Sequence, residues 1–293
     1  MKLCAGVLLG LIASISLPVI SQAQGIDMSS GGPVEVTARG TFEVHDADQL
    51  VIAEGDARAT RGTSTVLADR LVARYRKRQT TSIGNTAAES GNEVYRLEAH
   101  GNVRIVTPTD EARGDDATYD LDQSVLLITG KKLQLTTPSS LMTARDSLEY
   151  WSAQHMAVGR GNAVVTTNDA RRVAADILVA YTEDTATAAK QPGPAGKKSD
   201  DLAQSGQIKR VDAFGNVEVR TVSDIVRGDN GLYLPQTGQG RVVGHVRITR
   251  ADNQINGPAA DFDMKTGVAR IIAMPGARVE GLIVPSNPKA AAP

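Results

Sequence analysis

Five aspartates recur at matching places along the sequence, and among its residues they come nearest to a chemically active set. They are Asp69, Asp115, Asp146, Asp176 and Asp229. A row of carboxylates could act in acid–base catalysis or bind calcium through its oxygen atoms. Each aspartate, however, takes the same place at a predicted turn of a repeated unit, where Asp commonly binds backbone N–H groups. We therefore interpret the row as structural rather than catalytic.

The other candidates for chemistry are weaker. His45, His100, His155 and His245 are widely separated and lack the paired spacing of metal ligands. The stretch GPAGKKS, residues 193–199, lacks the four-residue spacer and the preceding strand of a phosphate-binding loop. The 32 Lys and Arg nearly balance the 33 Asp and Glu, which argues against a nucleic-acid partner. The sequence therefore predicts no enzyme, cofactor or metal site.

The aspartates belong to a unit that the chain repeats. Residues 99–120 read AHGNVRIVTPTDEARGDDATYD and residues 213–234 read AFGNVEVRTVSDIVRGDNGLYL, with ten identities and no gap. Polar insertions at 76–92 and 183–207 interrupt the repeats at the same point of the unit. This order indicates a duplicated module of three rungs. Further copies of its opening pattern, Gly, polar residue, aliphatic residue, begin at Gly55, Gly161 and Gly244.

The duplication predicts the domain organisation of the 293 residues. We expect a first module at 33–155 and a second module at 156–284, which share one architecture. Residues 183–207 are rich in Gly, Pro, Ala and Lys, and we interpret them as a flexible insertion in the second module. Residues 285–293 are predicted to be a disordered tail.

The amino terminus is predicted to be a signal peptide of residues 1–23. Lys2 supplies a positive end, residues 3–20 are apolar, and SQA at 21–23 fits a cleavage site with small residues. An uncleaved membrane anchor is the alternative, although the Ala, Gly and Ser content favours cleavage. Cleavage would also remove Cys4, the one cysteine, so the mature chain is expected to be exported and to form no disulfide.

The rest of the chain alternates between apolar and charged residues. VEVRTV at 217–222 and VRITR at 246–250 place aliphatic residues at every second position, which is typical of strands with one dry face. An interval of 13 residues separates most of the repeated glycines from the next Ala or Gly of the unit, and it fits two short strands joined by a turn. Long helical patterns are absent outside the signal segment. The sequence predicts an all-β fold of stacked, short antiparallel strands.

A stack of strands has two ends with unpaired backbone groups. Residues 34–44 and 268–284 alternate well and carry little protection for a sheet edge. These ends could add a strand from another β-protein. Alternatively, the tails of the chain fold over the ends and cap them.

The repeated rungs resemble those of the OstA/LptA family, periplasmic lipopolysaccharide-transport proteins. The resemblance rests on AEGDARATRGTSTVLADRLVAR at 53–74, on the two copies at 99–120 and 213–234, and on PVEVTARGTFEV at 33–44. It extends over residues 33–280, although Arg39 replaces the usual Asp and the module is present about twice. The resemblance implies an elongated, twisted, open β-jellyroll with an apolar groove.

A fold of this kind implies a lipid carrier. A methylene group is worth about 0.8 kcal/mol on burial, so an acyl chain of about a dozen carbons faces on the order of 10 kcal/mol against entering water. An apolar groove lowers this barrier. Ordinary packing in a closed core is the alternative for each candidate. The candidate lipid-binding residues occupy alternate apolar positions: Ala57, Ala59, Leu71, Val103, Ile105, Tyr119, Tyr150, Val165, Leu178, Val217, Val219, Tyr233, Val246, Ile248 and Phe262.

The resemblance also implies the partners and the location. They are lipopolysaccharide with its lipid A and the β-jellyroll domains of inner- and outer-membrane transport proteins, paired through edge strands. A head-to-tail homo-oligomer of the chain is a further option. The expected compartment is the periplasm. Two alternatives stay open: an anchored or outer-membrane-associated relative in the same pathway, and a β-solenoid enzyme acting on polysaccharide, which would require clustered carboxylates on one face.

Overall fold

The computed structural model describes residues 34–77, 92–182, 208–221, 223–273 and 278–282. The predicted signal peptide, the insertion at 183–207 and the tail at 285–293 lie outside the described residues. Within the described ranges, no helix has both the length and the apolar character that a membrane crossing requires.

The described residues form strands and one short 3-10 helix, with no α-helix. The strands of the first half are β1 (Glu35–Thr37), β2 (Phe42–His45), β3 (Leu50–Arg61), β4 (Ser64–Lys77), β5 (Asn92–Val106), β6 (Glu111–Asp120), β7 (Val125–Thr129), β8 (Leu133–Thr136), β9 (Ser140–Ala144) and β10 (Ser147–Trp151). The 3-10 helix Ser152–Gln154 then leads into β11 (Met156–Thr167), β12 (Arg172–Thr182), β13 (Ile208–Arg220), β14 (Ile225–Leu234), β15 (Gln239–Arg250), β16 (Asn253–Asp263), β17 (Val268–Ile272) and β18 (Glu280–Leu282).

Several long strands bend at a repeated glycine. In β5, Gly101 and Asn102 have φ angles of 76° and 50°, and together they lie opposite Asp115 of β6. Two residues opposite one form a β-bulge, which bends its strand. Glycine adopts a positive φ without steric cost, and Asn tolerates it better than most residues. The same pair of positive φ angles recurs at 55–56, 161–162, 215–216 and 244–245.

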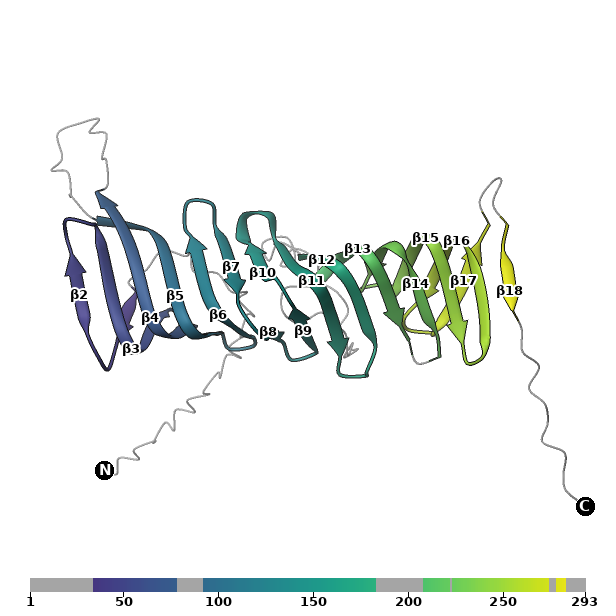
Figure 1. Cartoon of the computed structure of the whole chain (residues 1–293), viewed down its shortest axis with the longest axis horizontal. Coiled ribbons are helices and arrows are strands. Elements are labelled where there is room, and N and C mark those ends of the chain that lie inside the picture. The colour runs from purple at the N-terminus through teal and green to yellow at the C-terminus, as the bar shows by residue number, and fades with distance from the viewer. Residues whose placement is uncertain (1–33, 78–91, 183–207, 222, 274–277, 283–293) are drawn as a thin grey trace, which may run out of the picture.

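The bends fold one continuous antiparallel sheet of 18 strands into two layers. Layer I contains β2, β7, β10 and β17 together with the strand halves that pair with them. Layer II contains β1, β8, β9 and β18 together with the other halves. Strand β6 shows the division, because residues 116–120 pair with β7 whereas residues 111–113 pair with β8. Figure 1 shows the strands side by side along an elongated body, with β2 near one end and β18 at the other.

The core lies between the layers because buried and exposed side chains alternate along each half-strand. In β5, Val103 and Ile105 are buried whereas Arg104 between them is exposed. One cluster of buried residues, which includes Ile105, Leu133 and Tyr119, occupies the first half. A second cluster occupies the other half. The prediction of an all-β, antiparallel, jellyroll-like fold is confirmed.

Two equivalent reversals of layer II are built by threonine rather than by the repeated Gly and Asp. The hydroxyl of Thr107 accepts a hydrogen bond from the backbone N–H of Asp110 at 2.9 Å, and Thr221 does the same for Asp224 at 3.0 Å. The repeated aspartates instead lie within or beside strands at the bends, as Asp115 does in β6. The prediction that these aspartates occupy turns was therefore wrong, because a bulge needs the same residue types as a reversal.

Candidate functional site

An apolar cavity of about 630 Å³ lies between the layers in the first half of the molecule. Strands β1, β3, β4, β5, β6 and β7 contribute to its wall, and most of the wall is aliphatic. Polar residues at its border are Arg61, Glu93, Glu98 and Asp122. Its apolar wall includes Val34, Val36, Val51, Ala53, Ala59, Val66, Leu71, Ala73, Leu97, Ala99, Ile105, Ala117, Tyr119, Leu121 and Leu126.

The strand register explains why these side chains converge. In layer I, Ala53, Leu71, Ala99 and Ala117 lie directly opposite one another across β3, β4, β5 and β6. Directly opposed residues of antiparallel strands share a face, so the four side chains point into the same space. Three of them are alanines, which extend only a methyl group into the interior. The cavity is the space that these short side chains leave unfilled.

The cavity lies next to the edge strands at the amino-terminal end. Val34 and Val36 contribute to its wall. Phe42 and Val44 of β2 lie opposite Ala53 and Val51, which point inward, yet they are 56% and 58% exposed. These two side chains therefore continue the inner surface to the end of the sheet, where no further described strand covers it. The result is an apolar mouth.

A carboxylate at the border of the cavity is held by arginines. Glu98 accepts a hydrogen bond from Nε of Arg74 at 3.1 Å, and Nε of Arg96 lies 2.8 Å from it. Partial burial raises the pKa of Glu98, but the hydrogen bond and charge of Arg74 and the charge of Arg96 outweigh burial and leave this pKa below its ordinary value. Glu98 is therefore ionised at neutral pH, and the apolar wall of the cavity ends at this charged side chain.

The interior of the second half is packed by its own side chains. The rings of Tyr233 and Phe262 stack with their centroids 6.1 Å apart. Two hydrogen bonds join layer II turns to the turn that follows β16. Ser223 Oγ donates to the carbonyl of Gly267 at 3.3 Å, and Arg171 Nη1 donates to the carbonyl of Met264 at 3.3 Å. We call this pair of contacts the rim contact, because it joins the free margins of the two layers.

The fifteen candidate lipid-binding residues divide between these regions. Four line the cavity, namely Ala59, Leu71, Ile105 and Tyr119. Ala57 and Val103 are buried in the first half, and Tyr150 packs against its core cluster. The structure does not bring the remaining residues to the cavity. Contact with lipid stays a prediction for all fifteen. They belong to or pack against the second cluster: Val165, Leu178, Val217, Val219, Tyr233, Val246, Ile248 and Phe262.

Sequence reasoning missed several residues of the cavity wall. Val51 and Ala53 lie in LVIAEG, where the outward-facing Leu50 and Ile52 are also apolar and hide the alternation. Val66 is followed by Leu67 and Ala68, so a run of apolar residues hides the alternation there as well. The rim contact had no sequence signal, since Arg171 and Met264 lie 93 residues apart.

The five aspartates are dispersed along the bends. Nδ2 of Asn102 donates to Asp69 at 2.8 Å, and Nδ2 of Asn216 donates to Asp176 at the same distance. The backbone N–H of Lys131 donates to Asp115 at 2.7 Å. Within the part of the chain that the structure describes, no three His, Cys, Asp or Glu residues gather in a way that could hold a metal ion. The contacts of these aspartates stabilise the bulges.

The chain is similar to one protein family and to a solved structure. Residues 35–146 match the family model described as LptA/(LptD N-terminal domain) LPS transport protein. A crystal structure of LptH, the LptA homologous periplasmic component of the lipopolysaccharide transport device of Pseudomonas aeruginosa, is 16% identical with a TM-score of 0.37. That match covers 50% of this chain and 95% of LptH. A search of curated proteins found no match. The resemblance to the OstA/LptA family is thus confirmed by this family model over residues 35–146.

Proposed function

We propose that the chain is a non-enzymatic carrier in lipopolysaccharide transport that shields acyl chains between its two layers. The observation that carries the proposal is the apolar cavity beside the exposed edge at Phe42 and Val44. Supporting it is the lipopolysaccharide-transport description of the family whose model matches residues 35–146.

The size of the cavity sets what it can hold. Its volume of about 630 Å³ lies within the roughly 300–1,000 Å³ of pockets that enclose drug-sized ligands. That space suits part of a lipid with several acyl chains rather than the whole hydrophobic portion. Carriage along the full length of the molecule therefore requires the second interior to open. The two modules, 33–155 and 156–284, then act as successive segments of one carrier.

The edges of the sheet supply the proposed contacts with partners. Strands β1 and β2 pair only with β3 among the described strands, and β17 and β18 pair only with β16. Their outer backbone groups are open to a strand of another protein. We assign these edges to the β-jellyroll domains of inner- and outer-membrane transport proteins, or to further copies of this chain head to tail. The predicted signal peptide supports a periplasmic location.

The test compares neighbouring positions that point in opposite directions. A photo-reactive amino acid at Val66, which lines the cavity, is expected to label lipopolysaccharide in cells, whereas one at Leu67, on the outer side of the same strand, is not. Val165 and Val164 form the equivalent pair in the second half. Equal labelling at inner and outer positions would remove the support for an interior carrier.

A further inference from the structure

The outer face of layer II is rich in arginine. Alternation in the strands turns these residues to the surface opposite the core, as Arg58 shows between the buried Ala57 and Ala59. Within half-strands β3 to β16 of this layer, the outward acidic residues are Glu111 and Glu218. The outward arginines are Arg58, Arg104, Arg113, Arg172, Arg220, Arg227 and Arg247.

Several of these arginines lie directly opposite one another on adjacent strands. The opposed pairs include Arg172 with Arg220 and Arg227 with Arg247. Like charges in directly opposed positions destabilise a sheet. In layer I, Arg74 likewise lies directly opposite Arg96, whereas Arg241 lies directly opposite Asp261 and binds it at 2.6 Å. The arginines of layer II therefore occupy an arrangement that charge pairing within the sheet does not favour.

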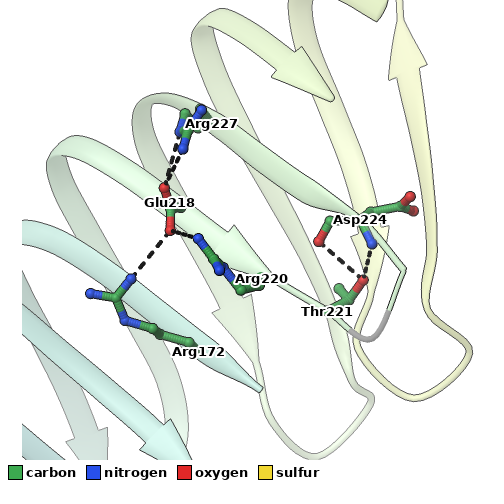
Figure 2. A network of polar contacts seen from close by, with 6 residues as sticks. All are labelled: Arg172, Glu218, Arg220, Thr221, Asp224 and Arg227. Atoms are coloured by element: carbon green, nitrogen blue, oxygen red, sulfur yellow. Dashed lines mark hydrogen bonds and ion pairs between the residues drawn. The ribbon is translucent and has the colours of Figure 1, made fainter. Parts of the chain in front are cut away.

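Glu218 holds the second-half arginines in place. Figure 2 shows Arg172, Arg220 and Arg227 converging on its carboxylate, with N···O distances of 3.3, 3.1 and 2.8 Å. Burial raises the pKa of Glu218, but the hydrogen bonds and charges of Arg227 and Arg220 outweigh it, so this pKa lies below its ordinary value. Glu218 therefore neutralises one charge, and with Arg247 beside Arg227 the cluster carries a net charge of about +3.

The guanidinium groups of this cluster have N–H donors that Glu218 does not use. A guanidinium carries five N–H donors in a planar fork, and Arg172 and Arg220 each direct one nitrogen to Glu218. The side chains of Arg172, Arg220 and Arg227 are 39%, 46% and 51% exposed. Arginine forks match the oxygen geometry of phosphate and bind it in a bidentate manner. The cluster presents an arginine platform of fixed geometry to a phosphate group.

The first half lacks an equal cluster at the corresponding place. There Arg104 and Arg113 share Glu111 at 2.7 and 2.8 Å, for a net charge of about +1. Arg113 of the first half corresponds to Arg227 of the second half. The residue directly opposite Arg113 is Gln134, whereas the residue directly opposite Arg227 is Arg247. The outer face of layer II thus carries two similar arginine clusters, of which the one in the second half has the higher positive charge.

We propose that Arg172, Arg220, Arg227 and Arg247 bind a phosphate group of a phosphorylated glycolipid. This inference rests on the proposed carrier function, because the lipid supplies the phosphate. Arg220 adjoins the turn at 221–224, which meets layer I at the rim contact through Ser223 and Gly267. When the rim contact opens, a lipid whose acyl chains pass between the layers at this margin would carry its headgroup beside the cluster.

The experiment measures the preference of the purified chain for phosphorylated lipid. Dissociation constants for bisphosphorylated lipid A, and for the same lipid after phosphatase treatment, are determined by microscale thermophoresis in a neutral detergent. The unchanged chain is expected to bind the phosphorylated lipid on the order of tenfold more tightly. The double variant R220Q and R247Q, which leaves Arg172 and Arg227 on Glu218, is expected to lose most of that ratio. R247E alone changes one exposed side chain and is expected to lower the ratio severalfold.

The matched control is the double variant R58Q and R113Q. It removes two charges from the same face of the first half and is expected to keep the ratio. Equal binding of both lipids by the unchanged chain, or an equal loss in the control, would overturn the phosphate site and leave the carrier proposal intact. Loss of the preference in about 1 mM inorganic phosphate would assign the cluster to the free ion instead. Failure to bind either lipid would contradict the carrier proposal itself, and the phosphate site with it.

Discussion

The interiors of the two halves differ, although one repeated strand pattern surrounds both. In the first half, Ala53, Ala99 and Ala117 face the interior and leave a cavity. In the second half, Phe262 lies over Gly240, and a Cβ added at this glycine would collide with the ring. A glycine on one strand thus makes room for a large side chain on the next, and the interior fills.

The middle of the molecule is filled in the same way. Met142 of layer II reaches Gly159 of layer I, where a Cβ would collide with its terminal methyl group. The comparison teaches that the repeat specifies strands, bends and layers, whereas a few large residues beside glycines decide whether an interior is open or packed. Protein interiors are otherwise close-packed, so an unfilled apolar space is a feature that sequence changes can remove.

The largest expected effect concerns the packing of the second half. Phe262→Ala removes a buried ring that rests on Gly240, and it should lower the free energy of unfolding by about 3–5 kcal/mol. Leu71→Ala removes a side chain that already borders the cavity, so its cost should be less than half as large. Urea unfolding followed by circular dichroism measures both. Equal costs would mean that the two interiors are packed alike.

A second difference lies in the two repeated turns of layer II. Asp224 is buried and its carboxylate accepts two hydrogen bonds from Arg250, both at 2.6 Å. The equivalent Asp110 is also buried, but its Oδ1 has no hydrogen-bond partner in the described structure, and burial raises its pKa despite a hydrogen bond from Thr109. Two copies of one turn thus hold one carboxylate that is paired with an arginine and one whose Oδ1 lacks a hydrogen-bond partner.

Replacement by asparagine should therefore act in opposite directions. Asp224→Asn weakens the charged pair and should cost about 1.5–3 kcal/mol, whereas Asp110→Asn should stabilise the protein at pH 7 by about 1–3 kcal/mol. Because the folded state raises the pKa of Asp110, ionisation of this carboxyl group destabilises the fold once the pH exceeds the ordinary value of 3.8. The gain from Asp110→Asn should therefore vanish below pH 3.8. Thermal unfolding between pH 3 and pH 7 tests this, and a gain independent of pH would contradict the role of ionisation.

The sequence predicted which faces of the strands point inward but not whether the interior is full. Alternation correctly placed Ile105 and Val219 inside, because burial of one face imposes a period of two. Whether Phe262 fills the space over Gly240 depends on register and layer spacing, which no local pattern encodes. The aspartates were predicted at turns because the interval of 13 residues within each unit contains both a reversal and a bulge, and Gly and Asp suit either.

The last prediction concerns a substitution that fills the cavity of the first half, so that its interior is packed like that of the second half. Ala99→Phe adds a ring to a buried position on the cavity wall, where there is space for it, so stability should change by less than about 1.5 kcal/mol. The filled cavity should reduce lipopolysaccharide labelling from a photo-reactive residue at Val66 by roughly tenfold, a difference of about 1.4 kcal/mol. Thr143→Phe adds a ring to the outer face of layer II, away from the arginine cluster, and should leave labelling unchanged. Undiminished labelling in Ala99→Phe would show that lipid contacts Val66 from outside, because a ring inside the cavity would then leave its path untouched.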